Sequence, residues 1–185
     1  MLLHTEETEQ DGVTVLYHKA ATNGIVHLNY YFRLTDCTLP ELTALSGLNR
    51  LLGVLPTKKH SAMELQQIVK THLGRLTFTV ANKEKAKCSN ATTPVLNVSC
   101  SVMPDKVDLA KDLIHEILTE TDFTQTDKIR EVVLQADEQA RQMCIMGGHM
   151  LAIIAASSHY SAGGAVDEAL RGYTCLLYTS PSPRD

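Results

Sequence analysis

Eight histidines give this chain its most visible capacity for chemistry, because imidazole binds metal ions and carries protons near neutral pH. Their spacing does not match a zinc-binding helix. His115 and Glu116 are followed by Ile-Leu-Thr, so the second histidine of a His-Glu-x-x-His motif is missing, and the sequence has no inverted motif either. His18 and His27 flank a predicted turn and could meet across it, but two imidazoles without a third ligand make a weak zinc site. We therefore expect both to face solvent.

His60 and Glu64 form a further pair that straddles a predicted helix start. Glu64 lies three residues after Ser61, which is the position from which a carboxylate closes a capping box, so capping is favoured over metal binding. The hydroxyl-rich segment 157–160 lacks the Gly-x-Ser-x-Gly context of a nucleophile elbow. Gly147-Gly148 and Gly163-Gly164 follow no strand and do not end in Gly-Lys-Ser/Thr, so neither is a phosphate loop. The sequence thus predicts no catalytic, cofactor-binding or metal site within the chain.

The five cysteines are scattered and form no Cys-x-x-Cys pair. An odd, unpatterned count is typical of reduced thiols in a cytosol-like compartment, so we predict a cytoplasmic location. Cys100 falls in the apolar stripe of a predicted strand, and Cys144 lies beside that of a predicted helix. Both are interpreted as buried structural thiols.

Length and composition favour one globular domain. The chain has 185 residues, of which 44% are hydrophobic and 21% charged. The net charge of −4 provides no basic footprint for nucleic acid. The longest apolar runs fall short of the roughly 18 residues that a membrane span needs, so neither nucleic acid nor membrane is an expected partner.

Alternation of apolar and polar residues predicts four strands. Thr22-Asn23-Gly24 separates the first two, and Asn-Gly is a strong signal for a tight hairpin turn, so these two strands are expected to pair. A polar loop over 82–93 is expected to join the last two. Residues 1–10 are polar and are interpreted as a linker. The predicted strands cover 13–19, 24–34, 76–81 and 96–102.

Helical periodicity fills the rest of the chain. Thr38 and Glu41 form a capping box for a helix whose leucine stripe continues to Leu55, where Pro56 ends it. Ser61 and Glu64 start the next helix. The later helices are expected near 105–118, from the box-like Thr124–Asp127 to about 143, over 149–160, and briefly over 167–172. Strands that each bury one face, combined with helices, indicate an α+β fold: an antiparallel sheet with helices packed on one face.

The last eleven residues, 175–185, differ in character from the rest. This Pro/Ser-rich tail back-translates without a mismatch as a transposon-type sequencing-library adapter. We therefore expect 175–185 not to be native, 11–174 to be one α+β domain, and that domain to be truncated at its C-terminal end.

Two segments carry a family resemblance, namely Tyr17 to Leu28 and Thr57 to Leu65. They resemble the third, non-catalytic domain and peptidase-associated region in the presequence-protease branch of the insulinase/pitrilysin zinc metallopeptidases. The resemblance extends over about residues 8–173. It implies four related α+β domains in the full-length enzyme, which close around an unfolded peptide. It also implies that zinc is bound by the first of these domains, where a zinc-bound water activated by a glutamate attacks the peptide bond.

In catalytic domains of that family, a helix after the first strand pair carries the inverted zinc motif, and a Gly-Thr follows shortly. Aligning that threonine with Thr57 places the three ligand positions on Gly47, Arg50 and Leu51. One of these lacks a side chain, one is cationic and one is apolar, so none can bind zinc. No catalytic residue is carried over to this chain.

The resemblance therefore implies a non-catalytic domain fragment of a zinc-dependent, peptide-degrading metallopeptidase, forming part of the wall of the substrate chamber. Its expected partners are the other domains of the same full-length chain and the unfolded peptide substrate. The fragment is expected to be inactive alone and to hold no cofactor, with zinc in the full-length enzyme. The alternative is a stand-alone, non-enzymatic binding or scaffold module of the same fold.

Overall fold

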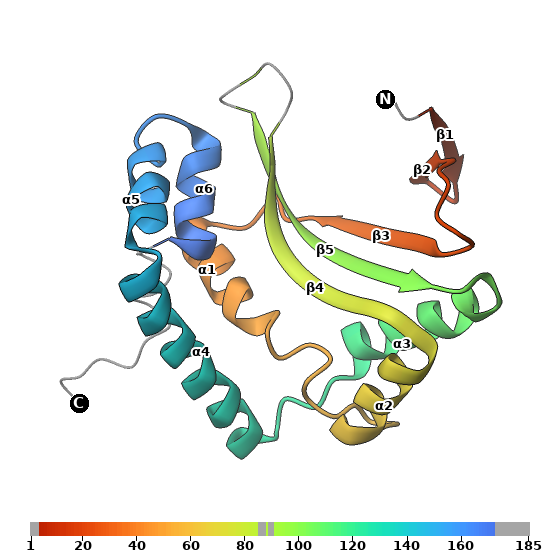
Figure 1. Cartoon of the computed structure of the whole chain (residues 1–185). Helices are drawn as coiled ribbons and strands as arrows, with labels where there is room; N and C mark the ends of the chain where they lie inside the picture. The colour runs from red at the N-terminus through yellow and green to blue at the C-terminus, as the bar shows by residue number, and fades with distance from the viewer. Residues whose placement is uncertain (1–3, 85–87, 89–90, 173–185) are drawn as a thin grey trace.

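The computed structural model describes residues 4–84, 88 and 91–172 (Figure 1). Five strands and six α-helices follow one another along these residues, with one short 3-10 helix, Pro104–Lys106, before α3. The strands are β1 (Thr5–Gln10), β2 (Val13–His18), β3 (Val26–Arg33), β4 (Leu73–Glu84) and β5 (Thr92–Val102). The helices are α1 (Leu39–Leu48), α2 (Ala62–His72), α3 (Val107–Glu120), α4 (Thr126–Met146), α5 (Gly148–Ser157) and α6 (Ala162–Arg171).

The main sheet has three antiparallel strands in the order β3-β5-β4, so β5 is central. Val26 pairs with Val102 at one end of β3, and Arg33 pairs with Val95 at the other. The predicted alternation of β5 is confirmed, because Val98, Cys100 and Val102 are all at most 2% exposed. This register places the apolar residues of all three strands on one face.

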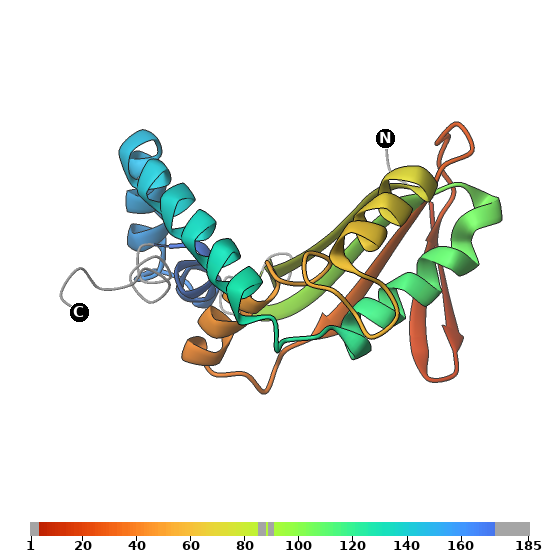
Figure 2. The same cartoon turned by 90° about the horizontal axis from the view of Figure 1, so that it is seen from below.

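Helices α2 and α3 cover that apolar face. The resulting core contains Leu65 of α2 and four buried apolar residues of α3, as the predicted stripe required: Ala110, Leu113, Ile114 and Ile117. Seen from the helix side, α2 and α3 lie in front of the strands (Figure 2). Each fully buried leucine or isoleucine here stabilises the fold by about 1.5–3 kcal/mol.

A smaller core lies where α1 and α6 meet the far end of β4. Leu42 of α1 packs with Val166 and Leu170 of α6. The buried hydroxyl of Thr43 donates a hydrogen bond of 2.8 Å to the carbonyl oxygen of Ala169, which joins the two helices. Helix α6 also approaches β4, where the Asn82 amide donates to the Gly163 carbonyl at 3.2 Å.

The predicted pairing across Thr22-Asn23-Gly24 is wrong, although the turn itself forms. Asn23 and Gly24 have φ of 52° and 81°, and the Ile25 N–H donates to the Thr22 carbonyl at 3.0 Å. The strands on either side nevertheless have different partners, since β2 pairs with β1 and β3 with β5. The reason is that β3 buries its apolar face only by joining the sheet that α2 and α3 cover.

The actual hairpin turn is Asp11-Gly12, with φ of 50° and 76°. It closes a two-residue loop between Gln10 and Val13, the geometry of a type I′ turn. The segment 1–10, interpreted from its polarity as a linker, therefore contains strand β1. This hairpin forms a separate two-stranded sheet beside the main one (Figure 1). Every residue of β1 and β2 is exposed.

Other boundaries differ more modestly. Helix α1 ends at Leu48 rather than Leu55, and turns follow in which Gly53 takes a φ of 77° that favours glycine. Helix α4 begins at Thr126 after an N-cap at Gln125, so the expected Thr124–Asp127 box does not form. The final helix, α6, starts at Ala162, five residues before the expected start.

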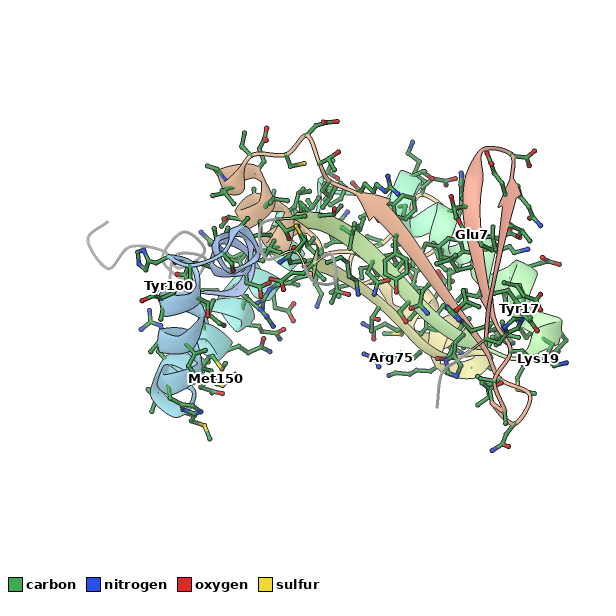
Figure 3. The ribbon with its side chains drawn as sticks, turned by 90° about the horizontal axis from the view of Figure 1, so that it is seen from above. Glu7, Tyr17, Lys19, Arg75, Met150 and Tyr160 are labelled. Carbon is green, nitrogen blue, oxygen red and sulfur yellow. The ribbon has the colours of Figure 1, made fainter. Side chains whose placement is uncertain are left out.

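The α+β class is confirmed: the antiparallel main sheet is packed against helices, and these helices lie on one face of it. Figure 3 shows the opposite face of the sheet, with the strands in front and the helices behind. No helix within the described ranges is long and apolar enough to cross a membrane. The tail assigned to an adapter, 175–185, lies outside the described residues.

Candidate functional site

The positions aligned with zinc ligands do not form a ligand set. Gly47 lies in the last turn of α1, whereas Arg50 and Leu51 lie in the turns after the helix ends. The Arg50 guanidinium donates to Oε1 of Gln139 on α4 at 3.5 Å, and the Leu51 side chain is buried. A cation and an apolar side chain are not zinc donors, so these residues do not fit the metal of the peptidase family.

The structure brings together a different polar group, around the buried carboxylate of Glu116 on α3. Its Oε1 atom lies 2.8 Å from Nδ1 of His60 and also accepts a hydrogen bond from the Thr57 hydroxyl. The Thr57 oxygen in turn accepts the backbone N–H of His60 at 3.0 Å. Glu116 is 6% exposed and is the one buried carboxylate among the described residues.

The environment of Glu116 keeps its carboxylate ionised. Burial acts to raise the pKa of this carboxyl, but the hydrogen bonds from Thr57 and His60 and the charges of His60 and Lys59 outweigh it. The pKa of Glu116 therefore lies below its ordinary value of 4.5. A carboxylate that hydrogen-bond donors keep ionised carries no proton to donate, and its lowered pKa makes it a weak base.

Backbone contacts around the Glu116 group fasten the α1–α2 connector to the end of α3. Thr57 and Thr121 form an isolated antiparallel bridge, and the Lys58 N–H donates to the Glu120 carbonyl at 3.1 Å. The Lys59 ammonium lies 2.9 Å from Oε1 of Glu120. The group acts as a structural clasp, and no set of three or more His, Cys, Asp or Glu residues suited to a metal ion occurs in the described part of the chain.

The histidines weighed as metal ligands lie apart from one another, and His18 and His27 are both exposed, as expected. His60 contacts Glu116, 56 residues away, while Glu64 accepts the Ser61 N–H at 2.8 Å and closes the predicted capping box. His18 Nδ1 lies 3.1 Å from the Thr5 hydroxyl. His27 Nδ1 lies 3.0 Å from the Ser101 hydroxyl, so His18 and His27 have separate partners in separate sheets.

The two cysteines that were expected to be buried differ in their exposure to solvent. Cys100 is buried as predicted, and burial raises the pKa of its thiol, which keeps it protonated and unreactive. Cys144 is exposed, so the prediction that it is buried is wrong, because α4 buries no residue at all. All four cysteines in the described ranges are unpaired.

Gly164, Ser157 and Ser158 have structural roles. A Cβ atom on Gly164 would lie 2.2 Å from the Ser157 carbonyl oxygen, so this glycine allows α6 to approach the end of α5. The Ser157 and Ser158 hydroxyls donate to carbonyls of their own helix, at 2.8 and 2.7 Å. This arrangement leaves neither serine paired with a base.

One feature that the sequence analysis missed is a cavity of about 510 Å³ between the α1–α2 connector, α2 and β4. The uncovered sheet face next to it carries His27, Arg33, Arg75 and Lys83, and none of the described strand residues on that face is acidic. The alternation of residues in the sequence indicated that this face is polar, and the positive charge of the face could have been predicted from the same positions. The cavity could not have been predicted, because it forms only where α2 packs beside β4.

Comparison with known proteins gives a family assignment. The family described as "Peptidase M-16C associated" matches residues 2–180. Protein HypA of Clostridium perfringens is 26% identical over 168 residues, covering 91% of this chain and 17% of that protein. The mitochondrial presequence protease of Yarrowia lipolytica is 24% identical over 176 residues, covering 92% of this chain and 16% of that protein.

An uncharacterized protein of Borreliella burgdorferi is 24% identical over 156 residues, with 16% of its length covered. The chain thus spans about a sixth of the length of the curated relatives it matches. The match to the family covers nearly all of the chain, and it agrees with the resemblance found at 17–28 and 57–65. This chain belongs to the family of domains associated with M-16C peptidases.

Proposed function

We propose that this chain forms a non-catalytic domain of a longer zinc-dependent, peptide-degrading metallopeptidase, where it supplies part of the wall of the substrate chamber. Family membership and the likeness to a presequence protease support the peptidase context. The observation that carries the proposal is an apolar surface on α4 and α5 that nothing in the described chain covers.

This α4–α5 surface is unusually apolar for an exposed helix pair. Helix α4 runs for 21 residues without one buried residue. Ile145 and Met146 are 84% and 82% exposed, and both lie near the junction with α5. Other apolar side chains of the two helices are exposed as well: Val133, Leu134, Met143, Met150 and Ile153.

The position of this surface suits contact with another domain. Met150 and Tyr160 lie at the end of the molecule away from the main sheet (Figure 3). A helix that buries no residue within its own chain gains stability by burying its apolar stripe against a partner. Because curated relatives are about six times longer, the rest of such a longer chain is the proposed partner.

The uncovered sheet face is the proposed chamber surface. It is polar, it lies opposite the helix layer, and its edge strands β3 and β4 each have one unpaired side within the described residues. Zinc and the catalytic residues would belong to another domain, since Gly47, Arg50 and Leu51 do not fit the metal. The unpaired cysteines support a reducing compartment, and we place the protein in the cytoplasm.

A split-chain experiment tests this proposal. The remainder of the full-length peptidase and this chain would be expressed separately, mixed, and assayed for hydrolysis of an unfolded peptide. We expect no activity from this chain alone and restored activity on mixing. The double substitution Ile145→Asp and Met146→Asp should prevent restoration, whereas Met63→Asp, at an equally exposed position on α2, should not. Full activity of the remainder without this chain would contradict the proposal and favour a separate scaffold module.

A further inference from the structure

The uncovered face of the main sheet carries charge of one sign. The strand register places alternate residues of the three strands on this face, opposite the buried Val98 and Cys100 of β5. The described strand residues of this face include no aspartate or glutamate, although the whole chain has a net charge of −4. Its basic side chains all come from the edge strands β3 and β4: His27, Arg33, Arg75 and Lys83.

The lysine and the two arginines of this face have no carboxylate partner within the described residues, and all three are exposed. Elsewhere, Lys59 and Arg171 illustrate the alternative, since each pairs with a carboxylate. The Lys83 ammonium lies 5.3 Å from the centre of the Tyr31 ring on β3, a contact that brings no anion to it. The face therefore presents positive charge that the described chain does not neutralise.

These basic residues form two groups, one toward each end of the face. Arg75 and His27 both pair with Ser101 and flank it in one row across the sheet, where His27 Nδ1 lies 3.0 Å from the Ser101 hydroxyl. This row lies in the half of the molecule that contains the β1–β2 hairpin (Figure 3). Arg33 lies six residues further along β3, and Lys83 lies near that end of β4. At about 3.3 Å per residue, the two groups are about 20 Å apart.

Neutral polar side chains occupy the face between the two groups. They include Asn29, Thr77, Thr79 and Ser99. Hydroxyls and amides both donate and accept hydrogen bonds, so this middle region suits the backbone of a polypeptide. In an extended peptide, acidic residues at positions i and i+6 are also about 20 Å apart, and both side chains point to the same side. The spacing of the basic groups thus matches an extended peptide with two acidic groups.

Protection of the sheet edges explains part of this arrangement. Charged side chains on edge strands discourage pairing with other chains, which accounts for the basic residues lying on β3 and β4. Either sign of charge would serve that purpose, so edge protection does not account for the absence of acidic residues. A bound anion accounts for it.

A single-stranded nucleic acid fits this face less well than a peptide does. Its phosphates repeat at every nucleotide, and proteins that bind it combine a continuous basic groove with aromatic side chains for stacking. Here the middle of the face is neutral. Tyr31 is the one aromatic residue among the described strand residues of the face, and Lys83 already contacts its ring.

We propose that the uncovered face of the main sheet binds an extended acidic peptide segment. Arg75 pairs with an acidic side chain at one end, and Arg33 and Lys83 pair with an acidic side chain six residues away. A guanidinium holds a carboxylate by charge-assisted hydrogen bonds, which fixes the position of each end. The identification of this peptide as a substrate rests on the proposed function, in which this face lines the chamber, whereas the binding itself does not.

Three synthetic peptides test the charge and the spacing separately. Each is threonine-rich, has blocked ends and carries an uncharged dye, and each is titrated with the full chain with fluorescence anisotropy as the readout. The first has two Glu-Thr-Glu groups whose centres are six residues apart, the second has the same four glutamates in one run, and the third has lysines in place of the glutamates of the first. The first should bind about threefold or more tightly than the second, and the third should not bind. Raising the salt concentration should weaken the binding, because exposed charges are screened.

Variants of the chain locate the binding on this face. Arg75→Gln alone, or Arg33→Gln with Lys83→Gln, should abolish the preference for the spaced peptide, because that preference needs both ends. All three substitutions together should weaken binding of the spaced peptide by about fivefold or more, since each exposed ion pair contributes roughly 1.4-fold to 5-fold. Circular dichroism of each variant verifies that the fold is retained.

A matched control removes the same amount of charge outside the face, at three exposed cations: Lys58→Gln, Lys70→Gln and Arg130→Gln. It should keep both the affinity and the preference for the spaced peptide. Equal loss in this control, equal binding of the second peptide, or no binding of the first at millimolar concentration would overturn the proposal. Equal or tighter binding of a thymidine oligonucleotide would overturn it in favour of nucleic acid. A shift toward the monomer on removing the three cations of the face would assign the face to a second copy of the chain instead.

The failure of this inference would be distinguishable from failure of the proposed function. Peptide binding is measured on this chain alone, without any catalytic domain. The restored hydrolysis described above depends on the α4–α5 surface, which lies outside the sheet. A chain that restores activity but binds no acidic peptide would retain the function and refute the binding face.

Discussion

Nδ1 of His60 lies 2.8 Å from Oε1 of Glu116, joining residues that are 56 positions apart in the sequence. This contact fastens the connector between α1 and α2 to the core helix α3. The same connector forms a wall of the cavity that Lys70 and Arg75 line. The clasp therefore positions one wall of that cavity, although Thr57, His60 and Glu116 do not line it themselves.

Substitution of Glu116 should destabilise the fold. Glu116→Ala leaves the Thr57 hydroxyl and the His60 imidazole without their acceptor, and we expect the free energy of unfolding to fall by about 1–3 kcal/mol. Chemical denaturation monitored by circular dichroism measures the change. Glu120→Ala serves as the control, because its ion pair with Lys59 is more exposed and should matter by less than about 1 kcal/mol. Equal effects would contradict the assignment of the clasp to Glu116.

Acid should weaken the same clasp. The pKa of Glu116 is lowered in the folded chain, so the unfolded chain binds a proton first as the pH falls. This carboxylate thus contributes stability that is fully present above pH 4.5 and is lost as the pH falls from 4.5 through the lowered folded pKa. Denaturation midpoints over that window should decline more steeply for the parent chain than for Glu116→Gln. Parallel declines would show that other carboxylates dominate.

The two glycines at the start of α6 should differ in their tolerance of alanine. A Cβ on Gly164 would lie 2.2 Å from a backbone oxygen of Ser157, which cannot move without shifting α5. The atoms nearest to a Cβ on Gly163 would instead be the ends of the Glu84 and Asn82 side chains, which can move more easily than a backbone. We expect Gly164→Ala to cost about 1–3 kcal/mol and Gly163→Ala clearly less, measured by thermal unfolding. The reverse order would refute the close approach of α5 and α6.

The exposed α4–α5 surface should make the isolated chain self-associate. Ile145 and Met146 are more than four-fifths exposed, and other apolar side chains of α4 and α5 are exposed as well. Ile145→Glu with Met146→Glu should shift the chain toward the monomer in gel filtration with light scattering. Met63→Glu, on α2, provides the control and should leave the elution unchanged. A sharp monomeric peak of the unsubstituted chain at high concentration would be inconsistent with this prediction.

Zinc should not bind stoichiometrically to this chain. The aligned positions Gly47, Arg50 and Leu51 offer no donor set, and the donors His60 and Glu116 are already engaged with each other. Equilibrium dialysis against micromolar zinc, followed by metal analysis of the protein, is the direct measurement. A one-to-one complex that His60→Ala abolishes would mean that the clasp is a metal site.

Sequence reasoning succeeded where one local pattern decides the structure. The alternation through Val98, Cys100 and Val102 and the stripe through Leu113 and Ile117 both predicted burial, because side-chain direction follows directly from strand and helix period. The capping box at Ser61 and Glu64 is equally local. The resemblance over 17–28 and 57–65 led to the family that the comparisons show.

Sequence reasoning failed where the structure depends on which distant segment a strand or side chain pairs with. Asn23-Gly24 and Asp11-Gly12 are both strong turn signals, and nothing local distinguishes the turn that joins two paired strands from the one that only redirects the chain. Strand β1 has no apolar alternation to reveal it. The His60–Glu116 contact and the cavity beside β4 arise from tertiary packing of distant segments, which spacing alone does not encode.

The central position of β5 has a consequence for synthesis of the chain. Strand β3 pairs with β5 alone among the described strands, and β5 begins at Thr92, well after β3 ends at Arg33. At the usual translation rate of about 5–20 residues per second, β3 waits several seconds on the ribosome for its partner. During that interval the apolar face of β3 is open to chaperones. Nascent chains that end before residue 92 should therefore bind chaperones more strongly than those that extend past 102.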